Sequence, residues 1–591
     1  MSSALTQLSP GIAVNEIDLT TIVPSVSLTV GAYVGQFNWG PCDTPRFVTN
    51  EKDLVALFGR PTANTTESFN ALSFLSCANF LAYTNSLYVV RVIEANTTLN
   101  ACANANSSLL IKNEDDYEFN YELTDSGNAY GAFAAKYPGR MGNSLTISMC
   151  SSGSQFSSWA YKNYFDTAPG TSQYIVDKTG NTTANDELHM ILIDSGGLFS
   201  GKANTILERF SFLSKASDAI NTNGASAYYK TYLRENSQYI YAIDPPYYAN
   251  TSSSWGKTSG EVSSYFSPSN YTTTLVGGAN GVLASDGELE IGWDAFKDKD
   301  TYEISLAFVG SANVAVSQYV LDNIVLGPES ESPTIGRRDT MLFVSPRYSD
   351  VVNKPRQQIT KLLEANDSFV SLLNRSSSYL VVDSGWKYQY DKYTNSNMWV
   401  PLNPDIAGLC AYTDQVADPW YSPGGFNRGK IKNGLKLAWN PNAAERDQIY
   451  KNGINPVISI RGEGIVLMGD KTFQAKPSAF DRINVRRLFI HLEKAISRAA
   501  RYSLFEFNDE FTRAQFVAMV EPYLKTVKGR RGILDFKVVC DETNNTGDII
   551  DRNAFVGDIY IKPARSINFI QLNFVAVKTA VDFNTVVINA E

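Results

Sequence analysis

The sequence predicts an α+β multidomain fold in which segments from both ends of the chain form an α/β core and β-rich domains are inserted between them. At 591 residues the chain is too long for one ordinary hydrophobic core. Helical and strand-like runs alternate up to about residue 95 and return from about residue 341. The stretch between them is rich in Asn, Ser, Gly and Tyr, with short alternating runs and polar turns that are typical of β-rich domains.

These breaks divide the chain into four expected parts. Residues 1–20 form an N-terminal arm. Residues 21–95 together with 341–591 form the core, which includes a C-terminal strand arm. Residues 96–187 form one inserted β domain, and residues 188–340 form a second inserted domain.

Composition and charge exclude several classes of protein. Hydrophobic residues make up 43% of the chain and charged residues 19%, which is globular composition and excludes wholesale disorder. The net charge is −9, and we expect no nucleic-acid partner because no basic stripe is present to meet phosphates. The densest basic stretches are Arg486-Arg487 and Lys528-Gly529-Arg530-Arg531. A solvated helix face or a salt-bridging interface explains them more readily than DNA does.

The six cysteines are scattered without short pairs, so we expect neither a disulfide framework nor a zinc site. We expect no cofactor and no metal. No long uncharged apolar stretch could span a bilayer, and the first residues do not resemble a signal peptide. The sequence therefore predicts a protein that is made in a cytoplasm and does not insert into membranes.

The first part of the core contains strands and helices in alternation. A half-buried strand is expected around Leu28, with Val26 and Val30 on the same face. Helices are expected over 53–58, stopped by Gly59, and from Ser68 or Asn70 onward. The run 87–93 predicts a buried strand.

Later segments give further predictions. Residues 190–193 predict a strand and 203–213 a helix. A helix opens near Asp481, with an apolar side and a basic side that carries Arg486, Arg487, Lys494 and Arg498. A second amphipathic helix follows Asp509 and is expected to be interrupted at Pro522. Strands are expected over 533–540, 558–562 and 567–577.

Several runs resemble catalytic motifs. The run Gly464 to Thr472 approaches a phosphate-binding loop, but Asp470 precedes Lys471 and a proline follows where the motif needs a helix, so we predict a strand ending in a glycine turn. The two histidines, His189 and His491, are far apart in the sequence and are expected to be structural. Two sets of acidic residues could supply the paired carboxylates of a glycosidase. Asp286, Glu288 and Glu290 could alternate on a strand face, and Asp414 and Asp418 could share a helix face. Solvated acidic faces are the more common explanation.

The loop 418–429 is more specific. Its two prolines fix φ, its three glycines allow tight turns, and Trp420 needs a pocket. The sequence predicts a rigid structural loop that includes Trp420, Pro423, Gly424, Gly425 and Arg428.

Short motifs near the two ends of the chain follow one another in a distinctive order. The first are Ser9-Pro10-Gly11-Ile12, Asn15-Glu16-Ile17-Asp18, Trp39-Gly40-Pro41 and Leu57-Phe58-Gly59. The later ones are Pro423-Gly424-Gly425 with Arg428-Gly429, Gly462-Glu463-Gly464, Ile483-Asn484-Val485-Arg486-Arg487 and Asn573-Phe574-Val575-Ala576. In this order the motifs, which cover residues 9–95 and 410–583, resemble the contractile bacteriophage (myovirus) tail sheath protein family.

This resemblance implies a structural subunit with no catalytic site. It implies a helical homo-oligomer of stacked hexameric rings around a tail tube, with baseplate and tail terminator proteins as further partners. The core would then be tube-proximal and the inserted domains would face outward. Contraction would drive the tube through the host envelope, and the location would be the virion, after assembly in the host cytoplasm.

The terminal strands have no obvious partner within the chain, and an unpaired strand must join a sheet elsewhere. In a sheath each would add to the sheet of a neighbouring subunit. The residues expected to take part in this strand exchange are Ile12, Val14, Ile17, Leu19, Phe536, Val538, Ile567, Phe569, Leu572 and Phe574.

A second hypothesis remains open, which is a tail-associated β-rich protein that binds or hydrolyses glycans. It would use the carboxylates as acid and base, with Tyr and Trp of the insertions as stacking platforms.

Overall fold

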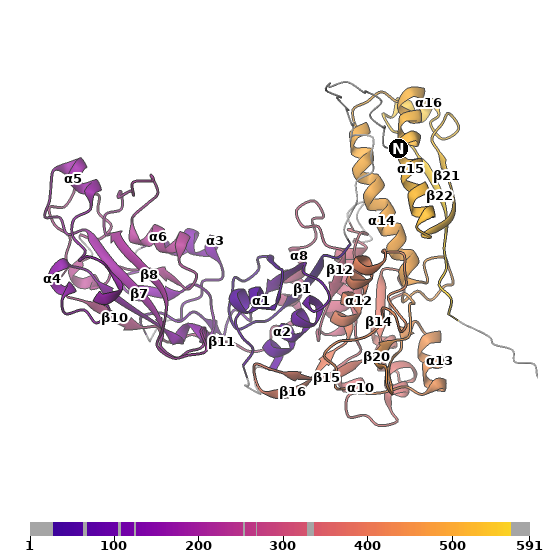
Figure 1. The fold of residues 1–591 in the computed structure, drawn as a ribbon, viewed down its shortest axis with the longest axis horizontal. Coiled ribbons are helices and arrows are strands. Elements are labelled where there is room, and N and C mark those ends of the chain that lie inside the picture. The colour runs from indigo at the N-terminus through magenta and orange to yellow at the C-terminus, as the bar shows by residue number, and fades with distance from the viewer. Residues whose placement is uncertain are drawn as a thin grey trace, which may run out of the picture. The chain divides into compact units, whose positions relative to one another are not determined.

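The structure is a computed structural model, which describes residues 28–62, 68–104, 108–122, 124, 126–251, 254–267, 269–327 and 336–568. The described residues divide into two compact units, 28–502 and 503–568. Figure 1 shows the elements of both units.

The larger unit is built on a seven-stranded sheet with the order β18-β14-β13-β12-β1-β3-β2. The strands pair in parallel, except that β2 runs antiparallel to β3. Their bounds are β1 Gly31–Gly35, β2 Arg46–Val48, β3 Leu87–Arg91, β12 Leu306–Phe308, β13 Met341–Val344, β14 Leu380–Asp383 and β18 Ile454–Asn455. Parallel strands need crossover connections, and here these supply the helices that cover the sheet.

Helices bury both faces of this sheet. Tyr33 of β1 points into one apolar cluster, whereas its neighbour Val34 points into the other. The first cluster is covered by α1 (Glu51–Phe58), α2 (Ser68–Leu81), α12 (Asn403–Val416) and α14 (Ile483–Ala500). The second is covered by α8 (Asp286–Asp294), α9 (Val314–Tyr319) and α11 (Phe369–Leu373).

The segment between β3 and α8 folds as one β-rich domain. Its largest sheet is antiparallel with the order β10-β6-β7-β8, made of β6 (Leu145–Cys150), β7 (Glu187–Asp194), β8 (Thr205–Ser214) and β10 (Tyr271–Thr274). Two smaller pairs join β4 (Thr98–Leu99) to β11 (Ala279–Asn280) and β5 (Phe133–Ala135) to β9 (Ile240–Ala242). The chain enters this domain at β4 and leaves it at β11, and the pairing of these two strands brings the two connections together.

The predicted domain boundaries at 187/188 and 340/341 differ from this arrangement. β6 pairs with β7 across the first boundary, so the two expected inserted domains share one sheet. β12, from within the expected second inserted domain, lies in the seven-stranded sheet between β1 and β13. The physical reason is that a buried parallel strand of only three residues leaves almost no periodicity in the sequence.

Two element predictions in the larger unit were wrong. The segment 203–213, predicted as a helix, is the strand β8. The strand expected around 26–30 begins only at Gly31, although the side chain of Leu28 is buried in the first cluster.

The smaller unit packs a helix against a hairpin. It contains α15 (Glu510–Gly529), β21 (Ile533–Val539), α16 (Gly547–Asp551) and β22 (Asp558–Pro563). The expected interruption at Pro522 is absent, because α15 continues through this residue. Pro522 lies on the exposed side of α15, where water can satisfy the carbonyl that loses its N–H partner.

Candidate strand-exchange site and structural loop

The hairpin β21–β22 carries two of the predicted strand-exchange residues. Phe536 pairs with Ile561 and Val538 with Ile559, in an antiparallel register with one irregularity near Asp535. Among the described residues of this unit, no third strand pairs with either outer edge. Because unpaired strand edges expose main-chain N–H and C=O groups, these edges are suited to accept strands from elsewhere.

The other predicted exchange residues lie mostly outside the described residues. Ile567 follows β22 and is 82% exposed. The predicted strand over 567–577 is described only to residue 568. The residues outside the described ranges are Ile12, Val14, Ile17, Leu19, Phe569, Leu572 and Phe574.

α15 supports the hairpin through an apolar seam. Phe516 of α15 is buried, and its ring meets that of Phe555 at 5.4 Å between centroids with the planes 78° apart. A Cβ at Gly557 would lie 2.8 Å from the Phe516 ring, so the chain needs a glycine there to approach the helix. Sequence reasoning missed Gly557, because a single glycine in a loop has no distinctive pattern.

The predicted structural loop 418–429 is fixed by packing and main-chain hydrogen bonds. Trp420 is 6% exposed, and its ring lies 5.8 Å from that of His491. The amide of Asn484 donates to the Trp420 carbonyl at 3.2 Å, which ties the loop to the first turn of α14. Pro423 is buried as well, and Arg428 donates to the Ser422 carbonyl at 2.9 Å.

The glycines of this loop meet β20 (Gly464–Leu467). Gly425 has φ of +88° and donates its N–H to the Leu467 carbonyl at 2.8 Å. A Cβ on Gly424 would lie 3.0 Å from the Gly469 carbonyl oxygen. The structure therefore places all five predicted loop residues in one segment that lies against α14 and beside β20.

α14 confirms the predicted apolar side but not the predicted basic side. Five apolar residues were expected on that side, of which Val485, Leu488, Leu492 and Ile496 are buried and Phe489 is partly buried. Arg487 is buried too, and pairs with Asp414 of α12 at 2.5 Å while donating to the Cys410 carbonyl.

Arg486 is also buried, and its guanidinium stacks 3.9 Å from the Phe480 ring centroid. Of the two earlier explanations for Arg486-Arg487, the solvated helix face is therefore wrong. The salt-bridging interface is confirmed for Arg487.

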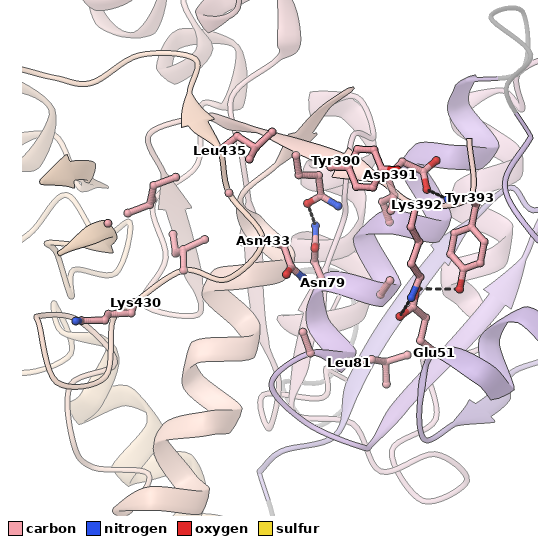
Figure 2. A pocket seen from close by; sticks show the side chains of 18 of the residues that line it. Glu51, Asn79, Leu81, Tyr390, Asp391, Lys392, Tyr393, Lys430, Asn433 and Leu435 are labelled. Carbon is pink, nitrogen blue, oxygen red and sulfur yellow. Dashed lines mark hydrogen bonds and ion pairs between the residues drawn. The ribbon is translucent and has the colours of Figure 1, made fainter. Parts of the chain in front are cut away.

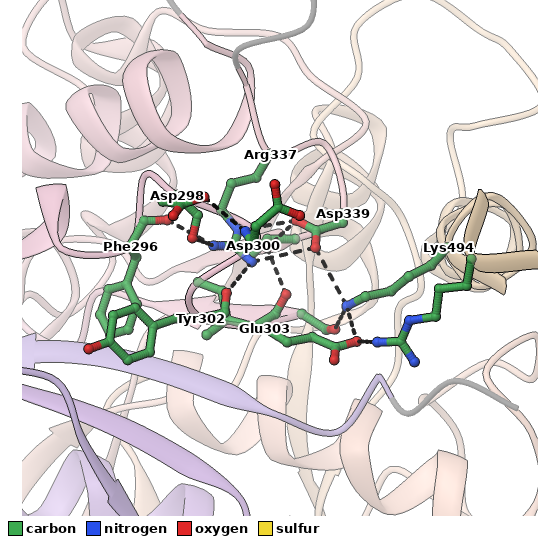
Figure 3. Close-up of polar contacts among 12 residues, drawn as sticks. Phe296, Asp298, Asp300, Tyr302, Glu303, Arg337, Asp339 and Lys494 are labelled. Carbon is green, nitrogen blue, oxygen red and sulfur yellow. Dashed lines mark hydrogen bonds and ion pairs between the residues drawn. The ribbon is translucent and has the colours of Figure 1, made fainter. Parts of the chain in front are cut away.

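The second half of α14 joins an ion-pair cluster (Figure 3). Lys494 lies 3.0 Å from Glu303 and 3.5 Å from Asp339, and Arg498 also pairs with Glu303. The buried Arg337 organises the acidic segment, since it donates to the carbonyls of Phe296, Asp298 and Tyr302. This cluster anchors α14 to the strands at the centre of the large sheet.

A groove of about 680 Å³ lies between α2, the hairpin turn after β15 (Trp386–Asp391) and the segment 430–435 (Figure 2). Two of its carboxylates are paired with lysines: Glu51 lies 2.9 Å from Lys392, and Glu463 lies 2.7 Å from Lys430. The third, Asp391, accepts hydrogen bonds from the N–H of Tyr393 and the hydroxyl of Thr394. Asn79 and Gln389 bond to each other at 2.8 Å. The arrangement offers no free acid–base pair for hydrolysis.

The other catalytic candidates have structural partners. The strand predicted in the run 464–472 is confirmed as β20, although residues 468–470 after it form no turn, and the ammonium of Lys471 donates to the Tyr450 carbonyl at 2.8 Å. Both ring nitrogens of His189 bond to main-chain atoms, those of Thr167 and Phe212, and burial lowers the pKa of this imidazole. The two histidines lie in different elements, β7 and α14.

Two of the acidic candidates also have structural partners. Asp286, Glu288 and Glu290 lie on the helix α8 and not on a strand, and Glu288 forms a capping box with Ser285. Asp414 pairs with Arg487, whereas Asp418 lies beyond the end of α12, so the two do not share a helix face. Among the described residues, no helix has the length and apolarity needed to cross a bilayer.

Comparison with known proteins gives two close relatives. A tail sheath protein of Vibrio phage KVP40 is 34% identical, over 99% of this chain and 100% of the relative. A tail sheath protein of Enterobacteria phage T4 is 33% identical, over 98% of this chain and 99% of the relative. The chain belongs to the phage tail sheath protein family. It is a structural subunit of a contractile tail sheath and therefore a component of the virion.

Three family profiles map onto the elements of the sheath subunit. The tail sheath protein Gp18 domain III N-terminal region matches residues 29–92, which contain β1 to β3. The phage tail sheath protein central domain matches 345–473, and the phage tail sheath C-terminal domain matches 475–576, with α14, α15 and the hairpin. The inserted β-rich domain lies between the matched ranges.

A solved sheath tail protein from Listeria innocua shares the fold of the sheath subunit. Its TM-score is 0.53 at 14% identity, over 92% of this chain and 93% of that protein. The family is thus the one that the two ends of the sequence resemble, and the mixed, multidomain α and β fold agrees with the expected class in its coarse form.

Proposed function

We propose that this sheath subunit polymerises around a tail tube as six-fold rings stacked into a helix, and that the polymer contracts to drive the tube through the host envelope. Assembly would take place in the host cytoplasm, with the tube, baseplate and tail terminator proteins as partners. The observation that supports this most is the hairpin β21–β22, whose outer edges carry no further strand among the described residues.

In this proposal each subunit lends both chain ends to its neighbours. Residues 12–19 and 567–574 would add strands to the edges of β21 and β22, where main-chain hydrogen bonds give affinity and alternate side chains give register. About 15 extended residues reach about 50 Å, which is enough to cross to another subunit. These strand pairings can persist while the globular parts move, so the sheath could shorten without its subunits separating.

The anchoring of α14 supports movement of the large unit as one body. The buried pair Arg487–Asp414, the loop around Trp420 and the cluster around Glu303 hold this helix at its start, middle and end. A packed core of this kind responds to force by repacking at its surfaces instead of deforming internally.

The energy for contraction would come from a metastable extended assembly and not from a nucleotide or an enzymatic reaction. The run that resembles a phosphate-binding loop has its lysine bonded to Tyr450, and of the acidic candidates for hydrolysis Glu288 caps α8 and Asp414 pairs with Arg487. We therefore propose a subunit without catalytic activity.

Replacement of the apolar residues in the N-terminal run tests strand exchange. The variant Ile12→Ser/Val14→Ser should keep the melting temperature of the parent protein but form no tubes in negative-stain micrographs. The matched control Asn15→Ser/Glu16→Gln changes polar neighbours only and should form tubes. Normal tubes from the first variant would show that this run is not exchanged.

A further inference from the structure

The smaller unit has oppositely charged ends. Side chains at the start of α15 and in the segment 541–551 are acidic and exposed; they are Glu506, Glu510, Asp541, Glu542, Asp548 and Asp551. Two hydrogen bonds of the Asn508 amide, to the side chain of Asn545 and the carbonyl of Ala554, hold these two segments together. We call this surface the acidic end. Its exposed basic residues are Arg552 and Lys537, which lies near Asp541.

The other end of α15 carries the opposite charge. The exposed residues there are Lys525, Lys528, Arg530, Arg531, Lys562 and Arg565, which we call the basic end. The N–H of Ala564 donates to the Gly532 carbonyl, which brings the segment after β22 beside the end of α15. Lys528 pairs with Asp535, and Lys525 pairs with Glu521.

Each end also exposes large apolar side chains. At the acidic end Phe505 is fully exposed, Phe507 is 83% exposed and Phe511 is 76% exposed. At the basic end Leu534 is 65% exposed and Ile567 is 82% exposed. Apolar groups surrounded by charge are typical of a protein interface with a central apolar contact and a polar rim.

The two ends cannot neutralise each other within one unit. α15 has 20 residues and is therefore about 30 Å long, three times the distance over which salt screens charge at ~0.1 M. Figure 1 shows α16 near one end of α15, with the hairpin running alongside the helix. The charge separation agrees with the helix dipole, which favours anions at the start of a helix and cations at its end.

We propose that the acidic end of one subunit binds the basic end of the next subunit, with Phe505 and Phe507 near the centre of the contact. A second copy of this chain is the partner that always presents both complementary surfaces. A contact between two different surfaces is heterologous, so it generates a ring or an open helix instead of a closed dimer. The inference rests on the proposed function, since it names a surface through which the sheath subunit would polymerise.

Charge-reversal variants of the full-length chain test this contact. Variant A carries Glu506→Lys and Glu542→Lys, and variant B carries Arg531→Glu and Arg565→Glu. All four side chains are exposed. For each variant alone, the concentration at which polymers form by light scattering should rise roughly tenfold or more, since like charges then meet at every contact.

A mixture of A and B gives the sharper result. When A and B alternate along the polymer, the reversed end of A meets the reversed end of B, and the two unchanged ends meet each other. An equimolar mixture should therefore polymerise within about threefold of the parent concentration. Salt at 0.5 M should weaken both the parent polymer and the mixed polymer. The matched control Asp166→Lys/Asp177→Lys makes the same charge change as variant A on the inserted domain, at two exposed residues, and should polymerise like the parent.

The outcomes separate this inference from the proposed function. Parent protein that remains a small oligomer overturns the proposed function. Only the head-to-tail contact is overturned if parent, A and B all polymerise at the same concentration. The same holds if the mixture fails to polymerise although A and B are folded. If variant B still self-assembles but no longer binds purified tail tubes, the basic end would be assigned to the tube, and the head-to-tail contact would also be overturned. If A or B fails to fold, the variant Phe505→Ser/Phe507→Ser gives a second test, because it keeps all charges. Normal polymerisation of this variant would contradict the contact.

Discussion

The guanidinium of Arg487 on α14 lies 2.5 Å from the carboxylate of Asp414 on α12, and the two side chains are 1% and 7% exposed. Removal of one partner leaves a buried charge without compensation. We therefore expect Asp414→Asn to lower the free energy of unfolding by about 3 kcal/mol or more. Urea unfolding followed by tryptophan fluorescence measures this change.

The double variant Arg487→Met/Asp414→Leu is the control, because it removes both charges and keeps apolar volume. Its stability should lie closer to that of the parent than the stability of Asp414→Asn does. A loss below about 1 kcal/mol for Asp414→Asn would contradict the assigned role of the pair.

The loop around Trp420 should be sensitive to truncation. Trp420→Ala removes a buried ring that contacts His491, and we expect a loss of about 3–5 kcal/mol in the free energy of unfolding. Phe426→Ala in the same loop is the control, because Phe426 is 47% exposed, and it should change stability little. Equal effects of the two variants would argue against a pocket for Trp420.

Gly425 should resist substitution because of its backbone conformation. Its φ of +88° is disfavoured for residues with a Cβ, so Gly425→Ala should destabilise the protein by about 1–2 kcal/mol. Gly287 lies inside α8 with no atom within 4 Å of a built Cβ. Gly287→Ala should therefore be neutral or stabilising, and thermal melts of the two variants would show opposite shifts.

Asp383 should make stability depend on pH. Burial raises the pKa of its carboxyl to about 8, from an ordinary value of 3.8, although Ser345 and Gly385 donate hydrogen bonds to it. Between these two values the folded protein holds a proton that the unfolded chain has lost. The free energy of unfolding should therefore fall as pH rises through this window, by up to about 1.4 kcal/mol per pH unit.

Asp383→Asn removes this titration and should leave stability less dependent on pH between 5 and 8. Urea unfolding of parent and variant at pH 5, 6.5 and 8 tests the difference. Parallel stability curves for the two proteins would mean that the carboxyl of Asp383 is ionised in the folded state.

The sequence predicted elements with a strong, uninterrupted period. α14 was predicted because five apolar side chains repeat at helical spacing, and β21 because Phe536 and Val538 alternate with polar residues. The loop residues Trp420 and Gly425 were predicted from residue type, since few other residues suit their positions.

The sequence failed where tertiary contacts override the local period. Register irregularities in β8 and the positive φ of Phe212 break its alternation, so Leu207, Phe210 and Leu213 repeat at intervals of three residues, as on a helix. The burial of Arg486 and Arg487 depends on the aromatic ring of Phe480 and the carboxylate of Asp414, which come from other segments. No local pattern reveals such partners.

Electron microscopy of the purified full-length protein tests polymerisation by this sheath subunit most directly. Negative-stain images should show long helical tubes of stacked rings, formed without added nucleotide and at the same concentration with or without it. Particles that remain small oligomers at all concentrations, or tubes that form only when nucleotide is added, would contradict the account.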